Sequence, residues 1–117
     1  MKEHQLQKSI IEYIKLQYPK ALYCASAGGL RTSITQAKRM KATGYIAGFP
    51  DLAIFEPLGY YYGLFLEIKT EKGRPSKKQL HWVESLNERN YKAVVVYGFD
   101  QAKKELDEYL NQKEFYV

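Results

Sequence analysis

Along the chain, stretches with helical spacing of apolar residues alternate with short, dense apolar runs. In residues 3–17 this spacing predicts an amphipathic helix that ends near Pro19, with its apolar positions at Leu6, Ile10, Ile11 and Ile14. Dense runs rich in β-branched and aromatic residues predict strands. The elements expected, in order, are helix 3–17, strand 21–26, helix 33–43, strands 51–56 and 62–70, helix 76–90, strand 91–99 and helix 100–111.

Residues that favour helix ends lie at the borders of these segments. Ser33 is a good N-cap for the second helix, and no helix breaker follows before Gly44. Ser76 takes the same place before the third helix, whose apolar positions are Leu80, Val83 and Leu86. Asp100 is expected to cap the last helix. The order α β α β β α β α, without a repeat or linker, predicts one α/β domain over residues 1–117.

The strand at 62–70 carries an acid and a base two positions apart. Successive side chains of a strand point to opposite faces, so Glu67 and Lys69 share a face with Phe65, and the opposite face holds Leu64, Leu66 and Ile68. Two interpretations fit this pattern. It is either an ion pair on a solvated face or a pair of functional groups.

A second acid comes beside this pair if strands 51–56 and 62–70 form a hairpin. The start of the first strand then lies beside the end of the second, which places Asp51 near Glu67 and Lys69. Two carboxylates at one sheet edge repel each other unless a cation lies between them, and oxygen ligands of this kind suit Mg²⁺ or Mn²⁺. Lys69 could then serve the attacking water. This convergence favours the functional interpretation.

Composition and charge indicate a soluble protein with a polyanionic partner. The 117 residues suffice for one domain, and the net charge of +5 with a pI near 9.2 favours nucleic acid without locating the contact. The single cysteine, Cys24, excludes an internal disulfide framework and is expected to be a small buried residue. The N-terminus has no apolar run typical of a signal peptide or membrane span. We therefore expect a cytoplasmic protein that does not enter a membrane.

Several segments resemble a nuclease family. Pro50-Asp51 followed by Glu67-Ile68-Lys69 matches the PD…(D/E)xK pattern of the restriction-endonuclease-like superfamily, a short pattern that also recurs by chance. The resemblance to the VRR-NUC (virus-type replication-repair nuclease) group is more specific and extends over nearly the whole chain, in GFPDLAIF, FLEIKTEKGRPSKKQLHW and VVVYGFDQA. It implies a restriction-endonuclease-like α/β fold, with a central mixed β-sheet flanked by helices, of the stand-alone type from phages or bacteria.

The resemblance also implies roles for individual residues. In the VRR-NUC group the residues that correspond to Asp51 and Glu67 are metal ligands, and the backbone carbonyl that corresponds to Ile68 is a third ligand. Lys69 corresponds to the lysine that serves the attacking water. The implied cofactor is Mg²⁺ or Mn²⁺.

Two further site positions leave alternatives open. Gln79 matches a glutamine typical of the group, but it could instead close a capping box with Ser76, and one rotamer cannot fill both roles; the active-site role is favoured. Related nucleases also use an acid on the first helix as a catalytic residue and metal ligand, for which Glu3 and Glu12 compete. Glu3 is favoured because it shares the face turned toward the protein with Gln7, Ile10 and Ile14, although a residue so near the terminus can fray.

Basic and aromatic residues indicate where other molecules bind. The candidate DNA contacts lie in loops and helices that flank the acids in sequence: Arg31, Lys38, Arg39, Lys41, Lys72, Arg74, Lys77 and Lys78. About half of them are expected to be ordinary solvated surface. His4 and His81 form no ligand pair and are expected at the surface. Tyr60, Tyr61 and Tyr62 at the hairpin turn cannot all face one core, so they are a candidate association surface.

The sequence thus predicts a divalent-metal-dependent endodeoxyribonuclease. Stand-alone domains that resemble this chain act as homodimers on branched DNA such as four-way (Holliday) junctions, and the same is expected here, in a bacterial cell or a phage-infected host. Two symmetric sites can cut two strands of a symmetric junction. Two alternatives stay open. One is a non-specific or nicking nuclease of the same superfamily, and the other is a DNA-binding module in which the acidic cluster is only a structural ion-pair site.

Overall fold

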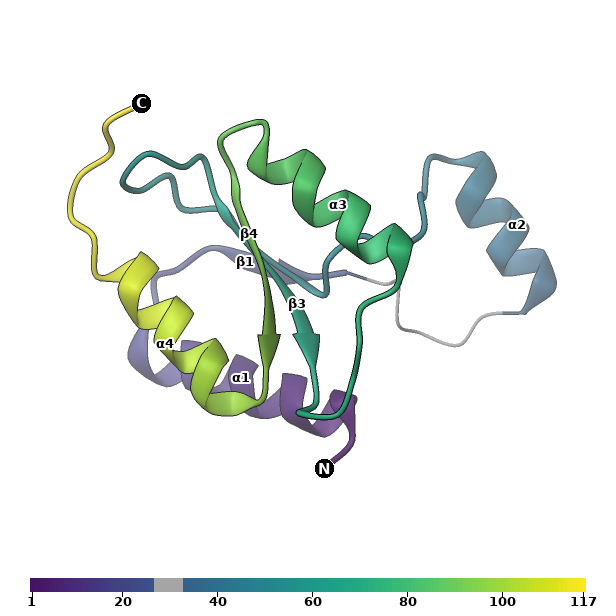
Figure 1. Ribbon diagram of the computed structural model, residues 1–117, viewed down its shortest axis with the longest axis horizontal. Helices are drawn as coiled ribbons and strands as arrows, with labels where there is room; N and C mark the ends of the chain where they lie inside the picture. Colours follow the sequence, from purple (N-terminus) through teal and green to yellow (C-terminus); the bar gives the residue numbers. More distant parts are fainter. Residues whose placement is uncertain (27–32) are drawn as a thin grey trace.

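A four-stranded sheet forms the centre of the protein, and helices cover both of its faces (Figure 1). The computed structural model describes residues 1–26 and 33–117, so the glycine-rich loop expected at 27–32, with the candidate DNA contact Arg31, lies outside the described residues. The elements are α1 (Glu3–Gln17), β1 (Tyr23–Ala25), α2 (Ile34–Ala42), β2 (Leu52–Ile54), β3 (Leu64–Lys69), α3 (Lys77–Asn87), β4 (Lys92–Tyr97) and α4 (Phe99–Leu110). Their order is the predicted one.

The strands follow one another across the sheet in sequence order, β1-β2-β3-β4. β2 is antiparallel to both of its neighbours, β1 and β3, and Leu52 of β2 lies opposite Leu66 of β3. β4 runs parallel to β3, which requires the crossover that α3 supplies. The predicted hairpin and the predicted mixed sheet are therefore confirmed, with shorter strands than the sequence indicated.

The alternation of side chains along β3 divides the core into two layers. Leu64, Leu66 and Ile68 pack with α1 and α4 on one face, and Phe65 packs with Leu86 of α3 on the other. All six residues of β3 are buried because neighbouring strands and helices enclose it on every side. The interpretation of Glu67 and Lys69 as an ion pair on a solvated face is therefore wrong.

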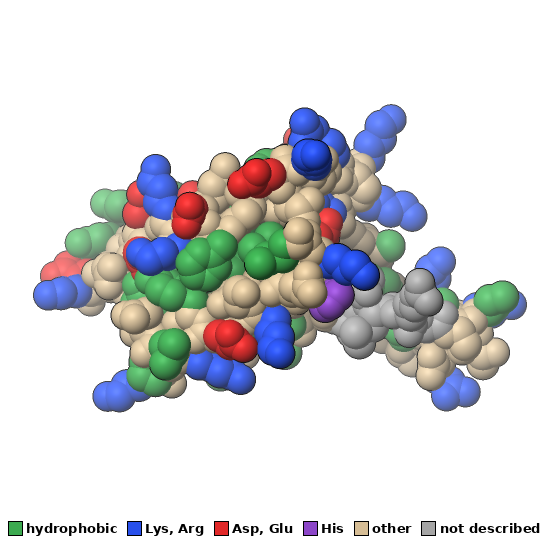
Figure 2. All heavy atoms as spheres, turned by 90° about the horizontal axis from the view of Figure 1, so that it is seen from below, with side chains coloured by type: hydrophobic (Ala, Val, Ile, Leu, Met, Phe, Trp, Pro, Cys, Tyr) green, Lys and Arg blue, Asp and Glu red, His purple; other side chains and the backbone are tan. Residues whose placement is uncertain are grey.

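Helix α2 stands apart from this layered body (Figure 1). None of its residues is buried, and in the described part of the chain it packs against no other helix or strand. Ser33 caps its start as expected, with its hydroxyl accepting from the Gln36 amide at 3.1 Å. In the view from below, this helix forms the arm at the right, from which lysine and arginine side chains extend (Figure 2). It offers a basic surface to solvent.

Three local predictions need correction. Helix α4 begins at Phe99 with Gly98 as its N-cap, because the positive φ of 86° at Gly98 turns the chain out of β4; Asp100 lies in the first turn instead. Cys24 is exposed because β1 is an edge strand. Leu80 is 42% exposed, so Trp82, Val83 and Leu86 form the inner face of α3.

The three consecutive tyrosines divide between core and surface, as their spacing required. Tyr61 packs against the main core, whereas Tyr60 and Tyr62 are 68% and 44% exposed. The C-terminal tail runs beside them, with the Gly59 amide donating to Glu114 and the Tyr60 and Tyr116 rings 5.0 Å apart. No helix of the described chain is long and apolar enough to cross a membrane.

Candidate active site

Asp51 and Glu67 meet where β2 begins. Leu52 lies opposite Leu66 in an antiparallel pair. Asp51, just before Leu52, therefore comes beside Glu67, just after Leu66. The Asp51 carboxylate accepts a 2.8 Å hydrogen bond from the Ile68 backbone amide, which fixes it against the peptide that joins Glu67 to Ile68. Two carboxylates separated by sixteen positions in the chain are thus held together by the register of one hairpin.

Glu67 has an unusual environment for a carboxylate. It is 1% exposed, and neither of its carboxylate oxygens has a hydrogen-bond partner. Burial, followed by repulsion from the Asp51 carboxylate, raises the pKa of Glu67 to about 8, although the Lys69 ammonium opposes the change. A buried acid without partners is costly to keep charged, and a cation bound beside it would remove that cost.

Lys69 lies between two of the acids. Its Nζ is 3.7 Å from the Glu67 carboxylate and 3.9 Å from that of Glu3, and the residue is 8% exposed. Glu3 therefore reaches the site from the first turn of α1, as the helical face indicated. Glu12 is exposed on the same helix and makes no ion pair among the described residues. The ammonium is close to both carboxylates but is not locked into a short salt bridge.

A hollow of about 420 Å³ opens beside Asp51, lined by the first two turns of α1 and by the end of β1. Apart from Asp51 and Glu3, its lining residues are His4, Gln7, Lys8, Ile11 and Ser26. The sequence reasoning assigned none of these five to the site, and His4 was expected to be surface alone. For the four residues on α1, helical spacing was the available signal, because Gln7 and Ile11 follow Glu3 at steps of four and Lys8 follows His4 in the same way. The hollow gives a substrate access to the acids.

Gln79 fills the second of its two proposed roles in this structure. Its side-chain oxygen accepts from the Ser76 amide at 2.8 Å, while the Ser76 hydroxyl accepts from the Gln79 amide at 3.2 Å. This is a complete capping box at the start of α3. The rotamer observed therefore supports the helix start, and the favoured active-site role has no contact in this structure to support it.

The oxygen atoms at this site fit a hard divalent cation. Within residues 1–26 and 33–117, no three side chains of His, Cys, Asp or Glu gather closely enough to hold a metal by themselves. Asp51 and Glu67 supply carboxylates, and the unpartnered Glu67 oxygens are the donors that most need a cation. Mg²⁺ commonly takes one or two protein carboxylates and keeps water in its remaining positions. The two carboxylates of Asp51 and Glu67 suit that habit.

Arg31 lies outside the described residues, and the seven predicted DNA contacts that the structure describes are all exposed and fall into three groups. Lys38, Arg39 and Lys41 lie on the isolated helix α2. Lys72 and Arg74 lie in the turn after β3, and Lys77 and Lys78 occupy the first turn of α3. The first group stands away from the body, whereas the others come directly after the strand that carries Glu67 and Lys69.

Comparison with known families agrees with this arrangement. The family model of the VRR-NUC domain matches residues 1–100. The chain belongs to the VRR-NUC family. It is similar to a solved VRR_NUC domain protein with a TM-score of 0.87 and 27% identity, over 99% of this chain and 93% of that one. A second solved chain, a VRR_NUC domain, has a TM-score of 0.62 and 26% identity, over 92% and 96% of the two chains. Among curated proteins, a search finds no match.

Membership of the VRR-NUC family confirms the family and fold that the sequence motifs indicated. The domain is of the nuclease type, and a nuclease of this family acts on DNA. The clustering of Asp51, Glu67 and Lys69 lies within the matched residues.

Proposed function

We propose that this VRR-NUC domain hydrolyses phosphodiester bonds of DNA with the help of Mg²⁺ or Mn²⁺. The observation that carries the proposal is the Glu67 carboxylate, buried without a hydrogen-bond partner and placed beside Asp51 and Lys69. A purely structural ion-pair site would satisfy its buried acid with donors. A site that awaits a cation leaves such oxygens free.

The residues divide the work as follows. Asp51, Glu67 and the backbone carbonyl of Ile68 would hold the metal, and the Ile68 amide orients Asp51 toward it. When bound, a divalent metal lowers the pKa of its water and stabilises charge on the phosphate. Lys69 would orient the attacking water, because the carboxylates of Glu67 and Glu3 hold its Nζ at the site. Glu3 supports Lys69 from α1.

Substitution of the central residues tests this assignment. Asp51→Ala and Lys69→Ala should reduce cleavage of a labelled DNA by a factor of at least roughly 100, the scale expected for loss of a positioned catalytic group, while DNA binding persists. Glu3→Ala should lower cleavage, whereas Glu12→Ala removes an exposed acid of the same helix and serves as the matched control. Wild-type cleavage in excess EDTA, or equally fast cleavage with Ca²⁺, would contradict the metal role.

The same variants separate the nuclease from the alternative of a DNA-binding module. A module without catalysis binds DNA with or without a divalent cation and forms no product under Mg²⁺ or Mn²⁺. If the wild-type chain binds DNA but never cuts linear, flap or four-way substrates, the catalytic proposal fails.

We further propose a homodimer that prefers branched DNA, in particular four-way junctions. The exposed rings of Tyr60 and Tyr62, with Phe115 and Tyr116 of the tail beside them, are the candidate for the shared surface. Light scattering at micromolar concentration should give the mass of two chains, and cleavage of a four-way junction should exceed that of a linear duplex. A monomer that cuts both at the same rate leaves only a general nuclease.

A further inference from the structure

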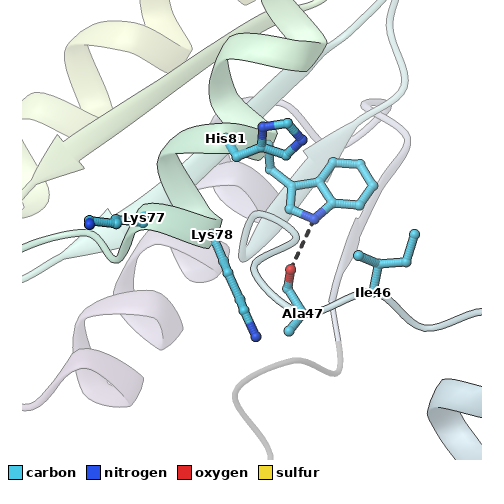
Figure 3. A pocket seen from close by; sticks show the side chains of 6 residues that line it. Ile46, Ala47, Lys77, Lys78 and His81 are labelled. Atoms are coloured by element: carbon cyan, nitrogen blue, oxygen red, sulfur yellow. Dashed lines mark hydrogen bonds between the residues drawn. The ribbon is translucent and has the colours of Figure 1, made fainter.

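A groove along helix α3 lies apart from the hollow at Asp51 and shares none of its lining residues. It consists of two hollows of about 310 and 330 Å³, which both include Ile46, His81 and Trp82. Helix α3 forms one wall, and the segment that leads to Asp51 forms the other (Figure 3). The remaining lining residues are Ala47, Lys77 and Lys78 in the first hollow and Ser85, Leu86 and Arg89 in the second.

The aromatic floor of this groove is held rigidly. The Trp82 indole nitrogen donates to the Ala47 carbonyl at 3.1 Å (Figure 3), and the ring meets Phe49 edge to face at 5.0 Å. At Gly48, whose φ is 95°, an added Cβ would lie 2.7 Å from the backbone carbonyl of Lys78, so the segment and the helix are in close contact. A ligand would therefore find the floor already ordered, and little conformational entropy is lost on binding.

The chemistry of the groove suits a flat apolar ring joined to an anion. Ile46 is 64% exposed and lines both hollows together with the indole of Trp82. Lys78 extends past Ala47 at one end, while Lys77 points to the other side of the helix start (Figure 3). Arg89 lies at the opposite end, where its guanidinium donates to the Ser85 carbonyl at 2.7 Å and is 4.0 Å from the Glu88 carboxylate. Among the described residues that line the two hollows, none is acidic. An aromatic floor between two cations is typical of sites that bind unpaired bases.

We propose that this groove binds an unpaired nucleobase of the DNA substrate, with the base against Trp82 and His81 and its phosphate at Lys78. The inference rests on the proposed function and specifies which part of the DNA is recognised. A fully paired duplex keeps its bases stacked inside and presents phosphates alone, so it would leave an apolar recess unfilled. The segment that carries Ile46 continues over five positions to Asp51, which joins the groove to the acidic cluster along the chain.

Trp82 is the only tryptophan of the chain, so it reports on the groove directly. The full-length protein is titrated with a short oligothymidylate in EDTA, which prevents cleavage, and the fluorescence of Trp82 is recorded. Stacking of a base should quench it in a saturable manner, and a blunt duplex at the same phosphate concentration should not. Ile46→Glu and His81→Ala should each weaken oligothymidylate binding by about 5- to 150-fold, the range found when a stacking side chain is removed.

Leu16→Glu is the matched control, because Leu16 is 79% exposed on α1 and lines neither the groove nor the hollow at Asp51. It changes the net charge as Ile46→Glu does and should leave binding unchanged. Binding without quenching, equal quenching by duplex, or equal losses in Leu16→Glu and Ile46→Glu would overturn the proposal. Cleavage under Mg²⁺ is scored separately: quenching without cleavage supports the groove and removes the nuclease function, and cleavage without quenching overturns the groove alone.

Discussion

Glu67→Gln should raise the stability of the metal-free protein and abolish its cleavage of DNA. The substitution keeps the shape of the side chain and removes only its charge. In the metal-free fold, burial and the nearby Asp51 carboxylate raise the pKa of Glu67 from its ordinary value of 4.5 to about 8. At about 1.36 kcal/mol per pKa unit, this rise corresponds to a penalty of at most about 5 kcal/mol for the charged form.

The sign of the pH dependence follows from the raised pKa. Well below pH 4.5 the carboxyl group is neutral in the folded and unfolded states, so its charge makes no difference between wild type and Glu67→Gln there. Between pH 4.5 and about 8 the wild type loses stability, because the unfolded state gives up this proton while the folded state still holds it. The stability of the variant does not change with pH in this way. If the introduced amide finds no partner, the variant carries a cost of about 1–3 kcal/mol that is the same at every pH. The advantage of the variant should therefore grow with pH.

Urea denaturation in EDTA, followed by Trp82 fluorescence at a series of pH values, measures this difference. Glu12→Gln, an exposed acid on α1, is the control and should leave the profile unchanged. In Mg²⁺ the order should reverse, because a bound cation stabilises only a protein that retains its ligands. Parallel pH profiles for wild type and Glu67→Gln would refute the reasoning that the fold holds this charge at a cost.

Two further substitutions test residues outside the acidic pair. Gln79→Glu preserves the capping box with Ser76, so the free energy of unfolding should change by less than about 0.5 kcal/mol. If this variant loses cleavage of DNA while its stability is unchanged, the active-site role of Gln79 is supported again. Asp107 accepts from the Tyr13 and Tyr18 hydroxyls at 2.6 Å each and from Lys103 at 2.8 Å; burial opposes the change, but these bonds lower its pKa from 3.8 to about 2. Asp107→Asn should therefore lower the free energy of unfolding by about 1–2 kcal/mol at neutral pH, as measured by urea denaturation. This effect should be present above pH 3.8 and disappear as the pH falls toward 2. An equal loss of stability at pH 2 and pH 7 would contradict this origin.

Local sequence patterns determined most of the elements of this protein and the members of its acidic cluster. Helical spacing located α1, and Ser33 and Ser76 marked the starts of α2 and α3, because caps and amphipathic periodicity act within a few residues. The Pro50-Asp51 and Glu67-Ile68-Lys69 motif predicted which residues would meet, since strand alternation and hairpin pairing bring them together.

Only the tertiary structure decided how those residues are surrounded. No local pattern showed that both faces of β3 are covered, and this burial is what leaves the Glu67 carboxylate without partners and raises its pKa. The same holds for the lining of the hollow by His4 and Lys8, and for the contact of Trp82 with Ala47 that builds the groove. Burial and contact depend on segments far apart in the chain, so their physical consequences appear only when those segments are packed together.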